Sequence, residues 1–247
     1  MMVQWLEADW PAPPGVRAIT TLRSGGVSEG GFASLNLATH VGDVAHAVAA
    51  NRARLKAALR LDAEPLWLDQ VHGIDVADVH EAAGAVPKAD GSVCVGEGKP
   101  CAILTADCLP VVFCDLAGTR VGVAHAGWRG LAGGVLGATV AAMQVPANTL
   151  LAWLGPAIEP DAFEVGAEVR EQFVARNAAA AGAFTANARG RWQADLYALA
   201  RVELASLGVL QVYGGAHRCF ADSARFFSYR REKATGRMAT LAWLSRE

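Results

Sequence analysis

The feature that most constrains this fold is a series of short apolar runs separated by turn residues. Residues 101–105, 111–115 and 120–124 form three such runs in close succession, and several of their members are β-branched. Runs of this length and composition are typical of buried β-strands. We expect further strands at residues 150–154, where the run ends at a Gly-Pro pair, and at residues 239–244 near the C-terminus.

Predicted helices are interspersed with these strands. Apolar residues recur at helical spacing over residues 44–59, with Asp43 as the expected N-cap. Residues 196–207 predict a helix that Asp195 caps and that ends just before Gly208. Further predicted elements are helices at 133–143 and 168–176, strands at 66–68 and 74–79, and a mobile alanine-rich connection at 175–188. Because no regular βαβ rhythm is present, the pattern favours an α+β fold, which we expect to form a single domain over residues 1–247.

Composition argues against several classes of protein. Hydrophobic residues make up 53% of the chain and charged residues 19%, which indicates an ordered globular protein. The net charge of -2 lacks the basic excess of proteins that bind nucleic acid or anionic membranes. No apolar run reaches the roughly 18 residues of a membrane span, and the first residues lack the basic region of a signal peptide. We therefore expect a cytoplasmic protein without nucleic-acid or membrane partners.

The five cysteines set a further limit. Their number is odd and no pair has Cys-x-x-Cys spacing, so neither a disulfide framework nor a local structural zinc motif is indicated. Cys94, Cys101 and Cys114 are expected to be small buried residues of the core.

Three segments place reactive side chains at predicted strand ends. Residues 70–73 read Gln-Val-His-Gly, and Asp107 and Cys108 lie between two apolar runs. His125 ends the next run and precedes the glycine-rich, basic stretch 126–130. Polar residues at strand ends beside glycines are where binding and catalytic sites are usually built.

His72, Cys108 and His125 form a candidate metal site. Two imidazoles and a thiolate suit zinc, with copper as the alternative. Three protein ligands leave a fourth position open, as in catalytic zinc sites that activate water and polarise substrate oxygens. Asp107 would orient a ligand or carry a proton. The same residues also fit a metal-free site in which Cys108 is a nucleophile, His125 its base, and Asp107 or another residue the group that orients the base.

A candidate anion site follows His125. Residues 127–130 lead to Gly133-Gly134 at a predicted helix start, where free backbone N–H groups and the Arg129 guanidinium favour a phosphate group. Close packing of the helix explains these glycines equally well. Arg23 and Asn36 lie in a second glycine-rich polar stretch, which is either a ligand-facing segment or a surface turn.

These motifs, taken together and in order, resemble the laccase-domain family, whose members are called polyphenol oxidases, purine nucleoside phosphorylases or peptidoglycan editing factors. The matching segments are residues 21–28, 34–37, 40–43, 70–73, 106–110, 125–130, 154–158, 163–166 and 225–231. The resemblance implies an α/β/β/α layered sandwich with mixed sheets and metal ligands at His72, Cys108 and His125. Residues 217–220 read His-Arg-Cys-Phe where relatives often have a Thr-Cys-Thr-like stretch, so the family pattern is interrupted there.

The resemblance implies phosphorolysis of adenosine, inosine, guanosine and methylthioadenosine, together with deamination of adenosine. The predicted function is therefore a zinc-dependent purine nucleoside phosphorylase and adenosine deaminase, a monomer or homodimer whose partners are a nucleoside and phosphate. The alternatives are an editing hydrolase for peptidoglycan precursors, a copper-dependent polyphenol oxidase and a non-enzymatic binding module. The chain has six histidines, which are few for a multicopper oxidase. Predicted catalytic residues are His72, Asp107, Cys108 and His125; predicted substrate-binding residues are Arg23, Asn36, Gln70, Arg129 and Arg230.

Overall fold

Two β-sheets packed face to face form the centre of the computed structural model, which describes residues 2–82 and 84–245. The four-stranded sheet has the order β1-β2-β13-β5, and all its neighbouring strands are antiparallel. Its strands are β1 (Trp5–Glu7), β2 (Val16–Thr21), β13 (Met238–Leu244) and β5 (Cys101–Thr105).

The six-stranded sheet has the order β12-β8-β6-β7-β4-β3. Its inner pairs are antiparallel, whereas the outer pairs β12–β8 and β3–β4 are parallel, so the sheet is mixed. Its strands are β12 (Gln211–Gly214), β8 (Leu150–Leu154), β6 (Leu109–Asp115), β7 (Arg120–Ala126), β4 (Gly91–Val95) and β3 (Val76–Asp78).

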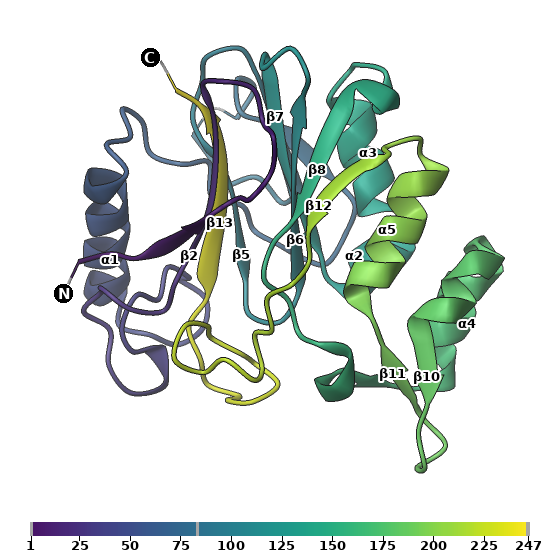
Figure 1. The fold of residues 1–247 in the computed structure, drawn as a ribbon. Helices are drawn as coiled ribbons and strands as arrows, with labels where there is room; N and C mark the ends of the chain where they lie inside the picture. Colours follow the sequence, from purple (N-terminus) through teal and green to yellow (C-terminus); the bar gives the residue numbers. More distant parts are fainter. Residues whose placement is uncertain (1, 83, 246–247) are drawn as a thin grey trace.

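Helices cover the outer face of each sheet (Figure 1). Helix α1 (Ala45–Ala58) packs on the four-stranded sheet, and α3 (Val135–Ala142) and α5 (Leu196–Ser206) pack on the six-stranded one. Figure 1 therefore shows four layers from left to right, which confirms the predicted α+β class and the α/β/β/α sandwich. The remaining elements are α2 (Trp128–Gly133), α4 (Ala167–Arg176), a small sheet of β10 (Phe184–Ala186), β11 (Trp192–Ala194) and β9 (Glu164–Val165), and 3-10 helices at Gly30–Phe32, Ala147–Thr149, Pro160–Ala162 and Ala178–Ala183.

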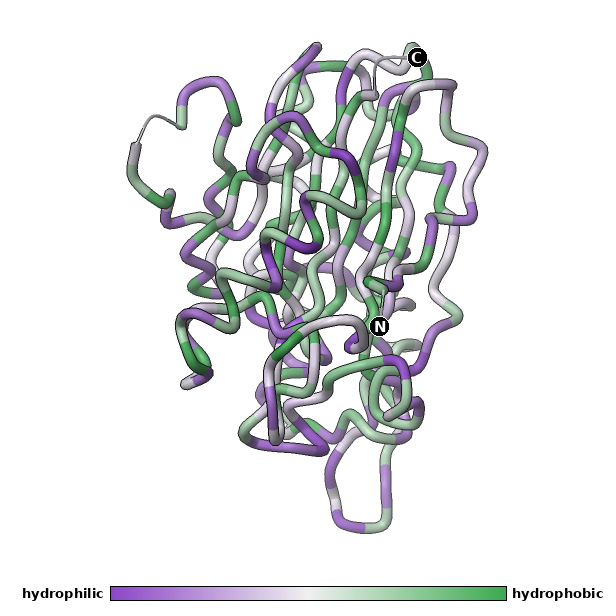
Figure 2. Tube along the Cα trace, turned by 90° about the vertical axis from the view of Figure 1, so that its left-hand side faces the viewer, coloured by the Kyte–Doolittle hydropathy of each residue, from purple (hydrophilic) through white to green (hydrophobic). Residues whose placement is uncertain are grey.

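The central strands read as continuous apolar runs because both of their faces are buried. Successive side chains of a strand point to opposite faces. In β8, Leu150, Ala152 and Leu154 therefore pack toward the helices, while Leu151 and Trp153 pack between the two sheets. Figure 2 shows hydrophobic colour recurring along these strands, whereas the projecting loop at the bottom is largely hydrophilic.

The longest apolar runs were located correctly by the sequence. Strands β5 and β8 have the predicted bounds, and β6 and β7 extend the predicted runs by two residues at one end. The strand predicted at residues 66–68 is wrong: Leu66 makes an isolated bridge to Cys101, without a continuous ladder.

Two helix boundaries illustrate where local signals succeed and fail. The Asp195 carboxylate accepts a hydrogen bond from the Ala198 N–H, and Gly208 has a φ of 86° just beyond α5, so both predicted caps are confirmed. Asp43 is not the N-cap of α1, because Val44 holds that position. The Asp43 carboxylate instead accepts hydrogen bonds from Ser28 Oγ at 2.6 Å and Asn36 Nδ2 at 2.9 Å.

Two other predictions need correction. The alanine-rich stretch 175–188 is not an unstructured connection, because it completes α4 and forms a 3-10 helix and β10, with Ala180 and Phe184 buried in the core. The helix predicted at residues 133–143 begins only at Val135. Gly134, with a φ of 103°, ends α2 and separates it from α3.

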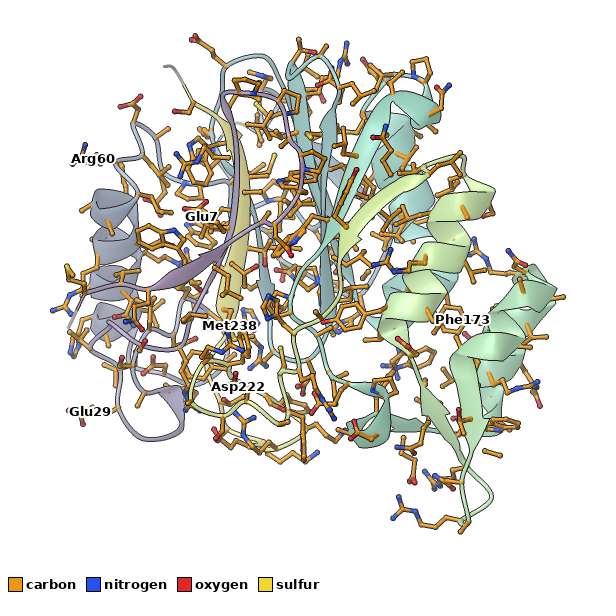
Figure 3. All side chains as sticks on the ribbon, in the orientation of Figure 1. Glu7, Glu29, Arg60, Phe173, Asp222 and Met238 are labelled. Atoms are coloured by element: carbon orange, nitrogen blue, oxygen red, sulfur yellow. The ribbon has the colours of Figure 1, made fainter. Side chains whose placement is uncertain are left out.

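One end of the sandwich gathers the reactive segments. The β5–β6 turn crosses from one sheet to the other at the lower end of Figure 1. Figure 3 shows Met238 at the lower end of β13 and Asp222 in the loop beneath it, so the 215–237 segment lies against the same end. No helix within residues 2–82 and 84–245 is long and apolar enough to cross a bilayer.

Candidate metal centre and substrate cavity

His72, Cys108 and His125 converge at this end of the sheets, although they are far apart in the sequence. One potential ligand atom from each residue lies within 4.8 Å of the other two. Cys108 Sγ is 3.8 Å from His72 Nε2, and the two imidazole ring centroids are 4.8 Å apart. Within residues 2–82 and 84–245 this is the one group of three or more His, Cys, Asp or Glu residues arranged to hold a metal ion.

Backbone geometry presents two of these side chains. Cys108 lies in the turn between β5 and β6, directly after Asp107, whose φ is 87°. His72 itself has a φ of 60° in the loop before β3. Left-handed backbone is uncommon for non-glycine residues and clusters at functional sites. His125 needs no such conformation, because it is the penultimate residue of the regular strand β7.

Asp90, which the sequence did not single out, supports two of the three candidate ligands. Its carboxylate is fully buried and accepts a hydrogen bond from His125 Nδ1 at 2.8 Å. It also accepts backbone N–H bonds from Val71 at 3.1 Å, His72 at 3.0 Å and Gly73 at 2.6 Å. One carboxylate therefore fixes the loop that carries His72 and orients the ring of His125, leaving His125 Nε2 free to act as the ligand atom.

The electrostatics of the group favour a thiolate. Burial alone would raise the pKa of the Cys108 thiol, but the His125 and His72 rings lower it to about 6. Burial lowers the pKa of His125, whereas Cys108 and the Asp90 carboxylate raise it to about 9. Burial likewise raises the pKa of Asp90, but hydrogen bonds from His125 and Gly73 bring it below its usual value. Without a metal, the group is therefore a thiolate beside an imidazolium near neutral pH.

The donor set fits a zinc-like ion. Ligand atoms bound to one tetrahedral ion lie about 3.3–3.8 Å apart, so the observed separations need shifts of only roughly 1 Å. Gly127 keeps the space open: a Cβ there would lie 2.9 Å from both Cys108 Sγ and His72 Cδ2. The thiolate and two imidazole nitrogens are the ligands that zinc and copper prefer.

A cavity of about 520 Å³ opens over the three candidate ligands, a size within the usual range of small-molecule sites. Aromatic rings of Trp128, Phe163 and Tyr229 line it together with aliphatic groups. Its cationic side chains are those of Arg129, Arg230 and Arg237. His40 also lines the cavity, but burial and the charge of Arg237 lower its pKa. The combination suits a flat, partly apolar molecule together with an anion.

Three of the predicted substrate-binding residues line this cavity: Gln70, Arg129 and Arg230. The Gln70 side chain is already engaged, because its Nε2 donates to the Leu104 carbonyl at 2.9 Å and its Oε1 accepts from the Leu104 N–H at 2.7 Å. Gln70 therefore ties the loop that carries His72 to the end of β5.

Arg23 and Asn36 are not among the described residues that line the cavity. Arg23 donates to the carbonyls of Ala33 and Ser223. Asn36 is fully buried. Its Nδ2 donates hydrogen bonds to the Ala38 carbonyl and the Asp43 carboxylate, and its Oδ1 accepts one from the Ala38 N–H. Both side chains hold the chain segments around the site in place, so the structure gives their predicted contact with substrate no support.

Of the predicted anion site, Arg129 lines the cavity, whereas Gly133 and Gly134 do not. These glycines separate α2 from α3, and neither lines the cavity. A Cβ on Gly133 would meet Ile74 at 3.0 Å, and one on Gly134 would meet the Arg176 guanidinium at 3.2 Å. They serve close packing, the alternative explanation from the sequence.

Asp107 lines the cavity beside Cys108. Its Oδ2 accepts the Arg230 N–H at 2.6 Å, whereas its Oδ1 is buried without a hydrogen-bond partner among the described residues. Burial raises the pKa of Asp107 above its usual value, although hydrogen bonds from Ser228 and Arg230 oppose this. The segment 217–220 contributes no lining residue, and Cys219 is fully buried.

Sandwich and site together define a layered α/β protein with a His-Cys-His candidate metal centre. The sequence pattern of the family described as multi-copper polyphenol oxidoreductase laccase matches residues 17–245. The chain belongs to this family.

Similar proteins cover nearly its whole length. Purine nucleoside phosphorylase PA4543 of Pseudomonas aeruginosa is 55% identical, over 98% of this chain and 99% of that protein. Purine nucleoside phosphorylase YfiH of Escherichia coli is 49% identical, over 98% and 100%. Among solved structures, protein NMB0706 of Neisseria meningitidis superposes with a TM-score of 0.95 at 52% identity, over 98% of this chain and 100% of that one. YlmD of Geobacillus stearothermophilus superposes with a TM-score of 0.90 at 32% identity, over 98% of this chain and 97% of that one.

Proposed function

We propose that this chain is a zinc-dependent purine nucleoside phosphorylase that accepts adenosine, inosine, guanosine and methylthioadenosine and also deaminates adenosine. The observation that carries the proposal is the convergence of His72, Cys108 and His125 at a cavity lined by aromatic rings and arginines. The names of relatives that are 49–55% identical over almost the whole chain support the phosphorolysis of purine nucleosides.

His72, Cys108 and His125 would hold the zinc ion. When bound, zinc supplies a Lewis acid that polarises an oxygen of the substrate or of water. Asp90 keeps His125 in the tautomer that a metal ligand needs. Trp128, Phe163 and Tyr229 provide rings on which a purine can stack.

Asp107 is the candidate proton carrier. In phosphorolysis, an oxygen of phosphate forms a bond to the ribose C1′ while the bond from C1′ to the purine nitrogen breaks. The electron pair of that bond stays on the purine, which then takes up a proton. Asp107 lines the cavity, burial raises its pKa, and one of its oxygens has no partner among the described residues, so it is the candidate donor of that proton. In deamination, an oxygen of water would form a bond to C6 of the purine while the bond from C6 to the amino nitrogen breaks, and the same carboxyl would give a proton to the departing ammonia.

The test combines metal analysis with product detection. Protein purified without chelators is expected to carry one zinc per chain. With adenosine and phosphate it should form adenine and ribose 1-phosphate, and without phosphate it should form inosine. Cys108→Ala should abolish both zinc binding and both reactions. Loss of zinc with retention of both activities would contradict the proposal.

A second candidate function is hydrolysis of a peptidoglycan precursor. Cys108, His125 and Asp90 form a chain in which a carboxylate orients an imidazole beside a thiolate, the arrangement that activates cysteine nucleophiles. Asp90, not Asp107, is the orienting group. In zinc-free protein incubated with a precursor peptide, the Cys108 sulfur should form a bond to an amide carbonyl carbon while the carbon–nitrogen bond breaks. The amine leaves with a proton from His125, and the thioester is visible as a mass increase. Turnover only with zinc and nucleoside would exclude this function.

The family description also keeps copper as a candidate metal. A His₂Cys set suits a single blue-copper centre, but a multicopper oxidase needs additional imidazoles. His40 is the one further described histidine at the cavity. An intense blue absorption band after copper loading, with oxidation of a polyphenol, would favour the oxidase over the phosphorylase.

A further inference from the structure

Three arginines line the cavity, and each is held beside an aromatic ring. The Arg129 guanidinium lies 4.4 Å from the centre of the Trp128 ring. The Arg230 guanidinium lies 5.5 Å from the centre of the Phe163 ring. The Arg237 guanidinium lies 5.8 Å from the centre of the ring of Tyr229, the residue that precedes Arg230 in the sequence. Stacking leaves the N–H edges of a guanidinium group able to bind an anion, although Arg230 Nη1 donates to the Ala162 carbonyl at 3.2 Å.

Arg237 is the most constrained of the three. It is half-buried, and its Nη1 donates to the carbonyls of Thr235 at 2.8 Å and Gly236 at 3.0 Å. Its backbone N–H donates to Asn36 Oδ1 at 3.0 Å, which fixes the start of β13. These contacts hold the guanidinium in place without neutralising its charge, because all the acceptors are uncharged.

The cavity arginines differ from their neighbours in the same C-terminal segment. Arg218 pairs with Asp161 at 2.6 Å, Arg225 with Asp222 at 2.5 Å and Arg231 with Glu232 at 3.2 Å. Neither Arg230 nor Arg237 lies within 4.0 Å of an acidic oxygen among the described residues, and neither does Arg129. The segment thus neutralises the arginines outside the cavity and leaves those that line it unpaired.

An unpaired charge that is partly removed from water is unfavourable unless a ligand compensates it. Asp107 and Cys108 are the acidic side chains among the described residues of the cavity wall, and three guanidinium groups outnumber them. The fork of an arginine matches two oxygens of a phosphate group in one plane. The surplus of positive charge therefore suits the cavity to an anion that has several oxygens.

We propose that Arg237, together with Arg230 of the same cavity lining, forms the subsite for inorganic phosphate, and that Arg237 is the principal phosphate-binding residue. This inference rests on the proposed function for the identity of the anion. It places the attacking phosphate at Arg237, just before β13, and not at the helix start after His125 where the sequence alone suggested it. Arg129, which is exposed on α2, contributes to the entry of the anion.

The test compares Arg237→Gln, Arg237→Lys and Arg17→Gln in the zinc-loaded full-length chain. Arg17 is the matched control, since it also stacks on a ring, that of Trp243 at 5.9 Å, but lies on β2 away from the cavity. Calorimetric titration with inorganic phosphate should show at least about a tenfold weaker Kd for Arg237→Gln, which corresponds to about 1.4 kcal/mol. Arg237→Lys should recover part of the loss, and Arg17→Gln should match the unchanged protein.

Steady-state kinetics provide the second readout. Arg237→Gln should raise the KM for phosphate about tenfold or more and change the KM for adenosine by less than about threefold. Equal phosphate binding and an unchanged phosphate KM in Arg237→Gln, with phosphorolysis intact, would overturn the subsite and leave the proposed function standing. If phosphate binding depends on Arg237 but the protein catalyses no phosphorolysis, the subsite would stand and the proposed function would be wrong. Melting curves of each variant exclude a general loss of folding, and Arg230→Gln provides an independent variant with the same expected direction.

A parallel titration with adenosine monophosphate identifies the source of the phosphate group. If Arg237→Gln weakens the binding of the nucleotide but not that of inorganic phosphate, the subsite belongs to a nucleotide, and the assignment to the attacking phosphate is wrong. Weakened binding of inorganic phosphate supports it.

Discussion

Replacing Asp90 with asparagine tests whether one carboxylate organises the metal centre. The two side chains have nearly the same shape, but asparagine exchanges one acceptor oxygen for an NH₂ donor. If the NH₂ group faces Val71 and Gly73, two backbone N–H groups lose their acceptor. If it faces His125, it donates to Nδ1 and forces the proton onto Nε2, the atom that would bind zinc.

The magnitude follows from the four hydrogen bonds that Asp90 accepts. Hydrogen bonds to a charged group contribute roughly 1.5–3 kcal/mol each. In either orientation, two of the four are lost or replaced by a hydrogen bond between uncharged groups. We therefore expect the free energy of unfolding of the zinc-free protein to fall by about 3 kcal/mol. Loss of a group that orients a ligand typically weakens metal binding about 10–100-fold.

The assay is competition for zinc with a chromophoric chelator, alongside urea unfolding of the zinc-free protein. Asp115→Asn is the matched control: Asp115 is also buried and accepts the Thr119 and Arg120 N–H groups at 2.7 and 2.9 Å. It lies at the opposite end of β6, roughly 20 Å from Cys108. The control should lose stability but keep its zinc affinity. Wild-type zinc affinity in Asp90→Asn would refute the reasoning.

Three further predictions concern the same centre. In zinc-free protein, iodoacetamide should alkylate Cys108 selectively, because the other four cysteines are buried. Since its thiol pKa is lowered to about 6, the rate should rise as pH increases through about 6 and then level off; an inflection near 8.5, the ordinary thiol value, would contradict this. Gly127→Ala should weaken zinc binding about tenfold or more by chelator competition while leaving the circular dichroism spectrum unchanged, since the new Cβ would lie 2.9 Å from Cys108 Sγ. Gln70→Ala should lower the Tm by about 4–8 °C, because two hydrogen bonds to Leu104 are lost; an unchanged Tm with a higher nucleoside KM would instead make Gln70 a direct substrate contact.

The sequence predicted the sheets better than it predicted the site. Strands β5 and β8 are visible as apolar runs because both of their faces are buried. Helix α2, only six residues long, is too short to show a period. The shared centre of His72, Cys108 and His125 was not predictable from spacing, since they are 36 and 17 residues apart; the resemblance to a family brought them together before the structure did.

Asp90 and Arg237 were missed for a physical reason. Asp90 precedes a short strand and is followed by glycine, which in the sequence resembles a turn. Its importance arises from the position of β4 between β3 and β7, which brings the carboxylate under the loop 71–73 and beside His125. Arg237 lies in a basic segment in which every arginine looks alike. Only the three-dimensional arrangement separates those with acidic partners from those without.

The β5–β6 turn has a consequence for how this chain resists unfolding. Cys108 lies where the backbone passes from one sheet to the other, His125 belongs to the second sheet, and Gln70 ties the His72 loop to the first. An ion bound by His72, Cys108 and His125 would link the two sheets at one edge and cross-link segments that are far apart in the sequence. Because only the folded protein brings these three ligands together, the ion would raise the free energy of unfolding by about 4 kcal/mol when its free concentration is a thousand times its Kd. The supply of metal would then govern the lifetime of the protein as well as its chemistry.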